Sequence, residues 1–565
     1  MPILPQTALF VIVQSWSVVL QLVSAYWYER QLSRYQKHWL VQLNKMVDLS
    51  GLEQACAGFQ TDNGQGRPIT HTPARLVRAL LIKYLYNLSL RQTEEMIDNH
   101  ILIKWFVGYP LFMPPLDHSY LNRFEMWLFR TNPRLFFDEV IRLIDRLCPE
   151  DRDRIQLVDT FALHGRVAKT YLVELLRDVC GKILPLLAET DPDFHLTLLA
   201  DLELMTLFGY RRDKITAALK GTERGQRLQD VARQALRLSR LLSHHLDQAT
   251  HLSPEQQFGL RVLLAYLDKI ISDETTLTAN NPDDPDDVTI IERKHGQKGT
   301  YRIISASDFE TTYRKHHDHK EAVPGFNATD LGTKVFVRET QVDTGAQQDN
   351  IALTEVLQAQ HHYHGFFPDF VAGDMKYGYG KTRYQVVQVT GGQTQVIALI
   401  PDYDKRSDLY NPRDFTLSDD GLALTCPNHK TTTRRYLTED KGGADFRFSV
   451  KCCRGCDHWD KCRGPDSKKS QPRNVFISFY RDQLEAAQQF NQTDIATQGL
   501  KERMNVERQI YSLTNIYGAR YAHSYGLKRT DYQLKMQATA YNLRQLVREM
   551  AKKGPSQGGV CPIAV

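Results

Sequence analysis

Two aspartates follow short apolar runs, and carboxylates in such positions can hold metal ions. Asp159 follows the run 155–158, and Asp374 follows the run 367–372. We expect each side chain to lie where a strand ends, so that both carboxylates could converge on two divalent cations such as Mg²⁺. Two cations roughly 3.5 to 4 Å apart activate a nucleophile and stabilise the leaving oxygen in phosphodiester cleavage. For either residue alone, a turn or helix cap is the commoner explanation.

A second group of residues with metal-binding chemistry is a cysteine cluster. Five of the nine cysteines fall within 37 residues, which indicates a metal site in a reducing compartment rather than a disulfide framework. Cys453, Cys456 and Cys462, with Cys426 upstream, could supply four thiolates to a tetrahedral structural Zn²⁺. Cys452 could replace Cys453 as one of the four ligands. The alternative to a zinc site is that these cysteines are buried and bind no metal. Such a zinc would order a short basic segment that cannot build its own core.

Two histidine-rich segments, 316–319 and 361–364, also contain potential metal ligands. Neither has an acidic partner at a spacing that completes a site. We therefore interpret these histidines as solvated polar residues.

Charge and composition limit the classes of protein to which this chain can belong. With 42% hydrophobic and 24% charged residues, the chain has the composition of a globular protein, not of a disordered or multi-span membrane protein. Residues 501–553 contain 11 Lys and Arg against 4 Asp and Glu, and residues 426–474 contain 12 against 6. These two basic blocks are suited to neutralising nucleic-acid phosphates, although basic faces also occur in proteins that bind no nucleic acid.

The elements that must position the aspartates are predicted from periodicity. Apolar residues at helical spacing over 72–129 predict a small helical domain, and 171–271 reads as a long helical stretch. Residues 280–287 (NNPDDPDD) are interpreted as a linker. Strand patterns then appear at 334–342, 367–372 and 395–401, and helical patterns return over 494–552.

The first 28 residues carry no charge, and 9–27 are largely apolar. A single membrane helix is one interpretation, but Gln14, Ser15, Ser17, Gln21 and Ser24 weaken it. A packed helix or a non-native upstream extension are the alternatives.

The segment KERMNVERQIYSLTNIYGARYAHSYGLKR, followed by QATAYNLRQL, resembles the last catalytic block of insertion-sequence transposases of the RNase H-like DDE superfamily. In that block, a helix with the final Glu precedes a Gly- and Arg-rich stretch and an "Asn-Leu" helix. The matching positions here are Glu507, Arg503, Gly518, Arg520, Gly526, Asn542 and Leu543.

The resemblance extends over most of residues 70–550. SASDFETTYRKH (305–316), with Gly325-Phe326-Asn327, looks like the strand region before the second Asp of such enzymes, and Asp349 looks like a polar position after it. The cysteine block lies where one branch of these transposases has a similar block. The helical N-terminal domain of such enzymes is matched by Thr72, Pro73, Arg91, Glu94, Trp105, Pro114, Pro115, Asp117, His118, Ser119 and Phe124.

The chain departs from the family pattern at three places. A Tyr that often precedes the Arg by three residues is Leu500 here, and a Lys that often follows the Glu by seven is Thr514. The second block often reads Asp-x-Gly-Tyr, whereas here 374–377 reads Asp-Met-Lys-Tyr. Glu502 is the nearest rival of Glu507 for the third carboxylate.

The resemblance implies Mg²⁺- or Mn²⁺-dependent hydrolysis at transposon ends, followed by attack of the freed 3′-hydroxyl on target DNA. The implied catalytic and metal-binding residues are Asp159, Asp374 and Glu507. Bidentate contacts of arginines would hold phosphates, although Arg503 could equally form an i,i+4 pair with Glu507. The implied DNA-binding residues are Arg503, Arg508, Arg520, Lys528 and Arg529.

The expected partners are double-stranded DNA and a second copy of the chain, with no small-molecule cofactor, in the cytoplasm and associated with the nucleoid. Two alternatives remain at this stage: an inactive, domesticated DNA-binding protein of the same fold, and a nuclease that cuts DNA without joining it.

The expected fold is multidomain α/β. It comprises an apolar extension (1–35), a helical N-terminal domain (36–150), an RNase H-like core (151–170, 300–420 and 475–553), a helical insertion with an acidic linker (171–299), a zinc-ribbon-like insertion (421–474) and a tail (554–565).

Overall fold

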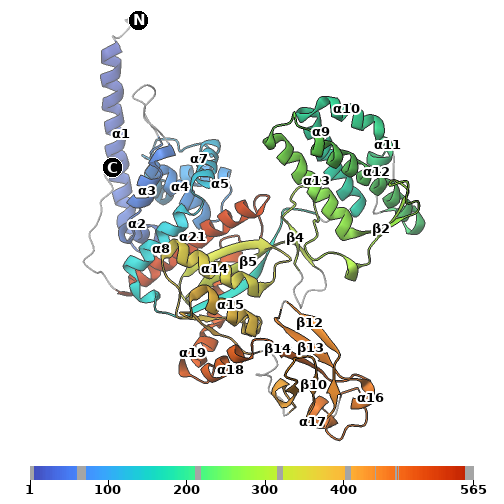
Figure 1. The fold of residues 1–565 in the computed structure, drawn as a ribbon. Helices are drawn as coiled ribbons and strands as arrows, with labels where there is room; N and C mark the ends of the chain where they lie inside the picture. Colours follow the sequence, from blue (N-terminus) through green and yellow to red (C-terminus); the bar gives the residue numbers. More distant parts are fainter. Residues whose placement is uncertain are drawn as a thin grey trace.

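A six-stranded mixed sheet lies at the centre of the computed structural model, with helices on both of its faces (Figure 1). The structure describes residues 6–59, 71–168, 170–209, 218–314, 322–400, 409–439, 441–464, 467–468 and 470–553. Helices and sheets are both present in several separately packed parts, which confirms the mixed α/β, multidomain class.

Strand β1 (Gln156–His164) is the central strand of this sheet. It pairs antiparallel with β5 (Val323–Gly332) on one side and parallel with β7 (Phe370–Ala372) on the other. Strands β6 (Val337–Thr344) and β4 (Thr312–Arg314) pair antiparallel with β5, and β8 (Gln395–Ile397) pairs parallel with β7. The parallel strands are joined through helices, as parallel pairing requires.

The two faces of β1 are covered by different helices. Val158 packs with α14 (Asp349–His364) and α15 (Gly380–Thr390), whereas Phe161 faces a core shared with the N-terminal helices and α21 (Leu527–Lys553). Leu157 packs with residues of α19 (Asp494–Glu502) and α20 (Met504–Asn515). Alternate residues of a strand point to opposite faces, so the neighbours Leu157 and Val158 contribute to cores on opposite faces of the sheet.

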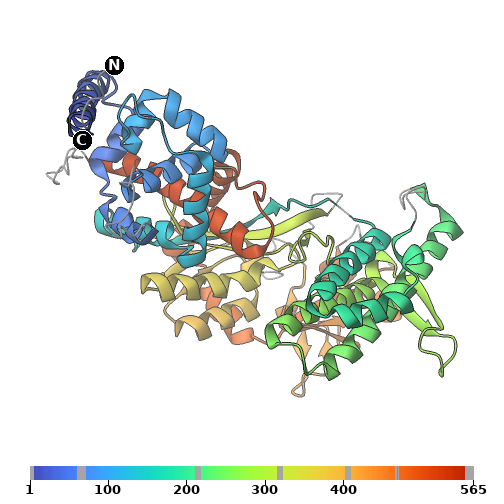
Figure 2. The same cartoon turned by 90° about the horizontal axis from the view of Figure 1, so that it is seen from above.

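The N-terminal helices pack around α21 rather than forming a separate body (Figures 1 and 2). Their starts follow ordinary capping chemistry: Thr72 caps the helix that begins at Pro73, and Ser89 forms a capping box with Gln92. The helices are α2 (Trp39–Met46), α3 (Ser50–Ala55), α4 (Pro73–Leu85), α5 (Leu90–Asn99), α6 (Ile101–Val107), α7 (His118–Thr131) and α8 (Leu135–Leu147).

Helix α1 (Gln6–Arg34) extends away from this group in Figure 1, and its second half packs against it. The Tyr28 hydroxyl donates a hydrogen bond of 2.6 Å to the Tyr109 carbonyl, and the Leu111 N–H donates to the Ser24 hydroxyl at 2.9 Å. Among the described residues, no helix has the length and hydropathy needed to cross a bilayer.

The long helical stretch forms an insertion with its own apolar core. It contains α9 (Leu172–Thr190), α10 (Pro192–Asp201), α11 (Leu204–Phe208), α12 (Gly221–Gln248) and α13 (Pro254–Glu274). The prediction of a linker at 280–287 is wrong. These residues form the loop of a hairpin between β2 (Thr275–Ala279) and β3 (Val288–Glu292), because Pro, Asp and Asn favour turns and the flanking residues are strand formers.

The cysteine segment belongs to a small β-rich subdomain, shown in orange in Figure 1. Contrary to expectation, it has an apolar core of its own, built around Phe415, Phe446 and Val475, against which three cysteines pack. Strand β14 (Asn474–Ser478), which we expected in the central core, pairs with β13 (Gly443–Arg447) here. The elements are β9 (Thr416–Leu417), β10 (Leu424–Thr425), β11 (Thr431–Thr432), β12 (Arg435–Thr438), β13 (Gly443–Arg447), β14 (Asn474–Ser478), α16 (Val450–Cys453) and α17 (Trp459–Arg463).

Buried ion pairs join the N-terminal helices to the central sheet. Arg338 of β6 is fully buried, and its guanidinium binds the fully buried carboxylate of Asp151 at 2.6 Å. Nearby, Arg134 binds Glu339 at 2.7 Å, and Lys535 of α21 approaches the same carboxylate at 3.3 Å. Each charge is compensated in place, which is the condition for keeping charges in a protein interior.

The Arg338→Met variant should lower the free energy of unfolding by about 3 to 5 kcal/mol, because it leaves Asp151 buried without its main partner. Urea denaturation followed by circular dichroism measures the change. The matched control is Arg142→Ala, which removes an exposed ion pair with Glu139 and should change stability by less than about 1 kcal/mol. Equal effects of the two substitutions would contradict this account of the interface.

Candidate active site

Asp159 lies in the middle of β1, not at the strand end that the sequence suggested. The strand continues to His164 because β5 pairs with it along residues 157–164. The apolar run that ends at Val158 therefore marks the point on β1 where fully buried residues give way to partly buried ones, and not the end of the strand. Beyond it, Asp159 and Thr160 are only partly buried, so the carboxylate opens toward the edge of the core.

Asp374 lies beside Asp159 because of the parallel register between β1 and β7. Leu157 pairs with Ala372, and each aspartate lies two residues further along its chain. Asp374 begins a 3-10 helix, and its carboxylate accepts the Lys376 backbone N–H at 2.8 Å. This turn needs a glycine before it, since a Cβ on Gly373 would lie 2.5 Å from the Tyr377 ring.

The pKa of Asp159 shows how closely the acidic groups gather. Burial, with smaller contributions from the negative charges of Asp374 and Asp349, raises the pKa of this carboxyl to about 6. The Thr160 N–H and the positive charge of Arg503 act in the opposite direction. Asp159 thus lies in a partly dry site in which nearby carboxylates repel one another.

A further carboxyl, Asp330 of β5, was missed in the sequence. It is the cross-strand partner of Asp159 and is fully buried, and within the part of the chain that the structure describes neither of its oxygens has a hydrogen-bond partner. Burial, and then the charge of Asp159, raise its pKa to about 8. An Asp inside the strand-like run 326–331 was the signal that could have revealed it.

Basic side chains border the aspartates on the side of α14. Asp349, which we had noted only as a polar position, accepts a hydrogen bond from Lys376 Nζ at 2.6 Å and from Asn327 at 3.1 Å. The Arg314 guanidinium donates to the Thr160 hydroxyl at 3.1 Å. Asp374, Arg314, Asp349 and Lys376 line a cavity of about 560 Å³ that also reaches Lys441 of the cysteine subdomain. No pattern in the sequence singled out these basic residues.

Glu507 lies in the first turn of α20, the helix that packs against β1 and β5. Val506 and Gln509 are buried against the sheet, while Glu507 is exposed beside them. Its rival Glu502 is engaged elsewhere, because its carboxylate accepts Lys334 Nζ at 3.1 Å and the Gln498 amide at 3.1 Å. At the departures from the family pattern, Leu500 packs against a core and the Thr514 hydroxyl donates to the Ile510 carbonyl.

The five basic residues expected to contact DNA lie in different settings. Arg503 is close enough to Asp159 to lower its pKa, and Arg508 is exposed on α20. Arg520 donates to the Thr514 hydroxyl at 3.3 Å. Lys528 and Arg529 are exposed in the first turn of α21.

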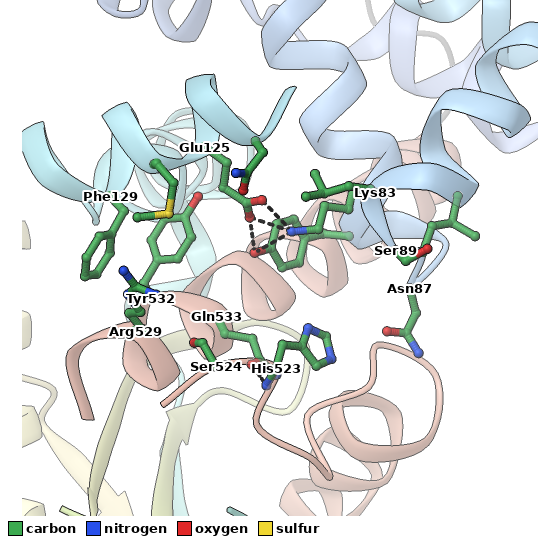
Figure 3. Close-up of a pocket in the computed structure, with 15 residues that line it drawn as sticks. Lys83, Asn87, Ser89, Glu125, Phe129, His523, Ser524, Arg529, Tyr532 and Gln533 are labelled. Atoms are coloured by element: carbon green, nitrogen blue, oxygen red, sulfur yellow. Dashed lines mark hydrogen bonds and ion pairs between the residues drawn. The ribbon is translucent and has the colours of Figure 1, made fainter. Parts of the chain in front are cut away.

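Arg529 also lies at a cavity between the N-terminal helices and α21 (Figure 3). Its guanidinium lies 5.7 Å from the centre of the Phe129 ring. Deeper in this cavity of about 460 Å³, Glu125 accepts hydrogen bonds of 2.6 Å from both Lys83 and Tyr84. Within this buried triad, the Lys83 ammonium group already neutralises the Glu125 carboxylate.

Within the described part of the chain, the potential metal ligands of the second histidine segment and of the cysteine segment form no compact group. Residues 316–319 lie outside the described residues. His364 is buried, not solvated as expected, and burial lowers its pKa to about 4. Among the residues that the structure describes, the cysteine sulfurs form no group of three or more within 4.8 Å of one another, and one Asp-His-His group does meet that criterion.

Two segments of the chain match models of known families. Residues 28–126 match a transposase domain (DUF772), and residues 425–547 match a transposase DDE domain. No curated protein and no solved structure matches the chain. The second match includes the cysteine segment, α20 with Glu507, and most of α21.

Both matched families are domains of enzymes that move DNA. The chain is a DDE transposase of an insertion sequence, an enzyme that cleaves DNA and transfers its strands. The expectation drawn from the sequence is confirmed. A DDE domain implies an RNase H-like core, and the mixed sheet around β1 agrees with that implication.

The Asp330→Asn variant should change the pH dependence of stability in the presence of a chelator. Folded Asp330 keeps its proton up to about pH 8, whereas the unfolded chain releases it near pH 4, so wild-type stability falls as pH rises between these values. Asn cannot ionise. At pH 9 the variant should therefore be more stable than the wild type by on the order of a few kcal/mol.

Denaturant titrations between pH 5 and 9 measure this difference. The exposed Asp153→Asn substitution is the matched control and should leave the wild-type profile unchanged. Parallel profiles for wild type and Asp330→Asn would show that Asp330 does not carry a buried proton.

Proposed function

We propose that Asp159, Asp374 and Glu507 are the catalytic carboxylates of this transposase and that they hold Mg²⁺ or Mn²⁺. The observation that supports this best is the register of β1 and β7, which puts Asp159 beside Asp374. Glu507 would join them from α20, the helix that packs on the same strand and begins next to Arg503, whose charge acts on Asp159.

The donor set suits hard divalent cations, which prefer carboxylate oxygens. Asp159 and Asp374 repel each other in a partly dry site, and the oxygens of Asp330 have no hydrogen-bond partner among the described residues. A divalent cation would relieve that repulsion and would supply a polarised nucleophile and charge stabilisation at the leaving oxygen. The chain's own part is to position the carboxylates and to exclude bulk water from behind them.

We further propose that DNA phosphates follow the basic residues around this site. Arg503, which precedes α20, and Arg508 on α20 flank Glu507 in the sequence, and Arg520, Lys528 and Arg529 would extend the phosphate contacts toward α21. On the other side of Asp374, Lys376 and Lys441 line the same cavity. Guanidinium and ammonium groups on both sides would hold a strand across the carboxylates.

The partners in this proposal are double-stranded DNA at the transposon ends and the target. A second copy of the chain is expected in the complex, because two ends must be joined. No small-molecule cofactor is invoked, and the protein would act at the nucleoid.

The cysteine subdomain is proposed to hold a structural Zn²⁺ through Cys426, Cys453, Cys456 and Cys462. Two donors already point at these sulfurs: the Lys430 N–H lies 3.4 Å from Cys426 Sγ, and the Asn428 amide lies 3.2 Å from Cys456 Sγ. Such hydrogen bonds favour thiolates over thiols. Cys453 packs against the subdomain core while Cys452 is exposed, which favours Cys453 as the ligand.

The variants Asp159→Asn, Asp374→Asn and Glu507→Gln should each reduce Mg²⁺-dependent cleavage of DNA that carries the element's own ends by at least about 100-fold, because each removes a charged metal ligand. DNA binding should persist in all three. Glu502→Gln is the matched control, one turn away on a neighbouring helix, and should keep most of the activity.

The assay separates the remaining alternatives. Binding without cleavage by the wild type would indicate a domesticated DNA-binding protein. Cleavage with no strand-transfer product would indicate a nuclease, and full cleavage by Glu507→Gln with loss in Glu502→Gln would reverse the choice of the third carboxylate.

Replacing Cys453 with Ser should remove one equivalent of zinc from the purified full chain, measured by elemental mass spectrometry, since three thiolates bind zinc more weakly than four. The neighbouring Cys452→Ser variant is the control and should keep the wild-type zinc content. The opposite pattern would make Cys452 the ligand, and an unchanged zinc content in both would argue against the site.

A further inference from the structure

We propose that Asp191, His245 and His251 form a binding site for a divalent transition metal in the helical insertion, separate from the catalytic carboxylates and the cysteines. The ligand atoms of these three residues all lie within 4.8 Å of one another. Nε2 of His245 and Nε2 of His251 each lie 2.8 Å from the same atom, Asp191 Oδ2. Two imidazole nitrogens and one carboxylate oxygen therefore point at a common centre.

The carboxylate is held in place by the turn between two helices. Asp191 ends α9 and caps α10, and its Oδ1 accepts the Phe194 backbone N–H at 3.1 Å. That bond leaves Oδ2 directed at the histidines. The side chain of Asp191 is only 7% exposed, so its charge needs a partner in this position.

The two histidines differ in exposure. His245, in the last turn of α12, stacks on the Phe194 ring with centroids 3.6 Å apart and an interplanar angle of 3°. This stacking orients its ring. His251, in the turn before α13, has a side chain that is 59% exposed. The site is thus rigid on one side and open to solvent on the other, which provides a path for an ion.

The chemistry of the ligands selects the class of metal. Neutral imidazole with one carboxylate suits Zn²⁺ and related transition ions, whereas Mg²⁺ and Ca²⁺ prefer oxygen ligands alone. Zinc requires nitrogen and oxygen ligands at roughly 2.0 to 2.2 Å, so the present oxygen-to-nitrogen separations need to open by only a few tenths of an ångström. On binding, each Nε2 gives up its hydrogen bond to Asp191, and the imidazole proton moves to Nδ1 or to solvent.

The position of the site indicates a structural effect. It ties together three segments of the insertion: the elbow between α9 and α10, the end of α12, and the turn that leads into α13. An ion bound only by the folded state stabilises that state by mass action. The metal would therefore stiffen the insertion without entering DNA cleavage.

The alternative is that Asp191 simply accepts two histidine hydrogen bonds and binds no ion. Full-length protein is stripped with a chelator, reloaded with Zn²⁺, desalted, and analysed for bound zinc. His251→Ala is the informative variant because its exposed side chain can be removed with little risk to folding. His244→Ala is the matched control, because His244 is an exposed histidine on α12, the helix of His245, and lies outside the group.

We expect His251→Ala and His245→Ala to bind one equivalent of zinc less than the wild type, and His244→Ala to bind the wild-type amount. Zinc should also raise the melting temperature of the His244→Ala control more than that of His251→Ala. Anomalous scattering from crystals of the zinc-loaded protein should place an ion at Asp191. Equal zinc content in all four proteins, or no ion at Asp191, would overturn the proposal, whatever the outcome of the cleavage assays.

Discussion

The position of β1 at the centre of the mixed sheet is the constraint on which the rest of the structure depends. Its antiparallel partner supplies Asp330, its parallel partner leads to Asp374, and α20 packs across it with Glu507. The strand thereby places Asp159 next to Asp330 and Asp374, which come from distant segments of the chain. A shift of one residue in its register would turn Asp159 to the opposite face and separate it from these groups.

Strand β1 and its neighbour β5 carry carboxyl groups whose charged forms are disfavoured by burial. Burial raises the pKa values of Asp159 and Asp330, whereas the ion pairs around Arg338 and Glu339 are compensated within the fold. The contrast is informative. Charges that join the N-terminal helices to the sheet have protein partners, whereas the carboxylates around Asp159 repel one another.

The two insertions are accommodated because each buries its own apolar residues. The helical insertion packs around residues such as Leu176 and Leu238, and the cysteine subdomain packs around Phe446. Neither needs the central sheet for its core. The N-terminal helices are different, since they share one apolar core with α21 and with Phe161 of β1, so the segments at the two ends of the chain fold against each other.

The sequence by itself determined the class of enzyme, the helical and strand segments, and the candidates Asp159, Asp374 and Glu507, because apolar periodicity and the order of motifs are local features. Only the tertiary structure decided that Asp159 lies inside a strand, that 280–287 closes a hairpin, and that Asp330, Arg314 and Lys376 surround the site. Asp191, His245 and His251 were invisible for the same reason. Strand register and helix packing are long-range interactions, and no spacing along the chain records which distant residues they bring into contact.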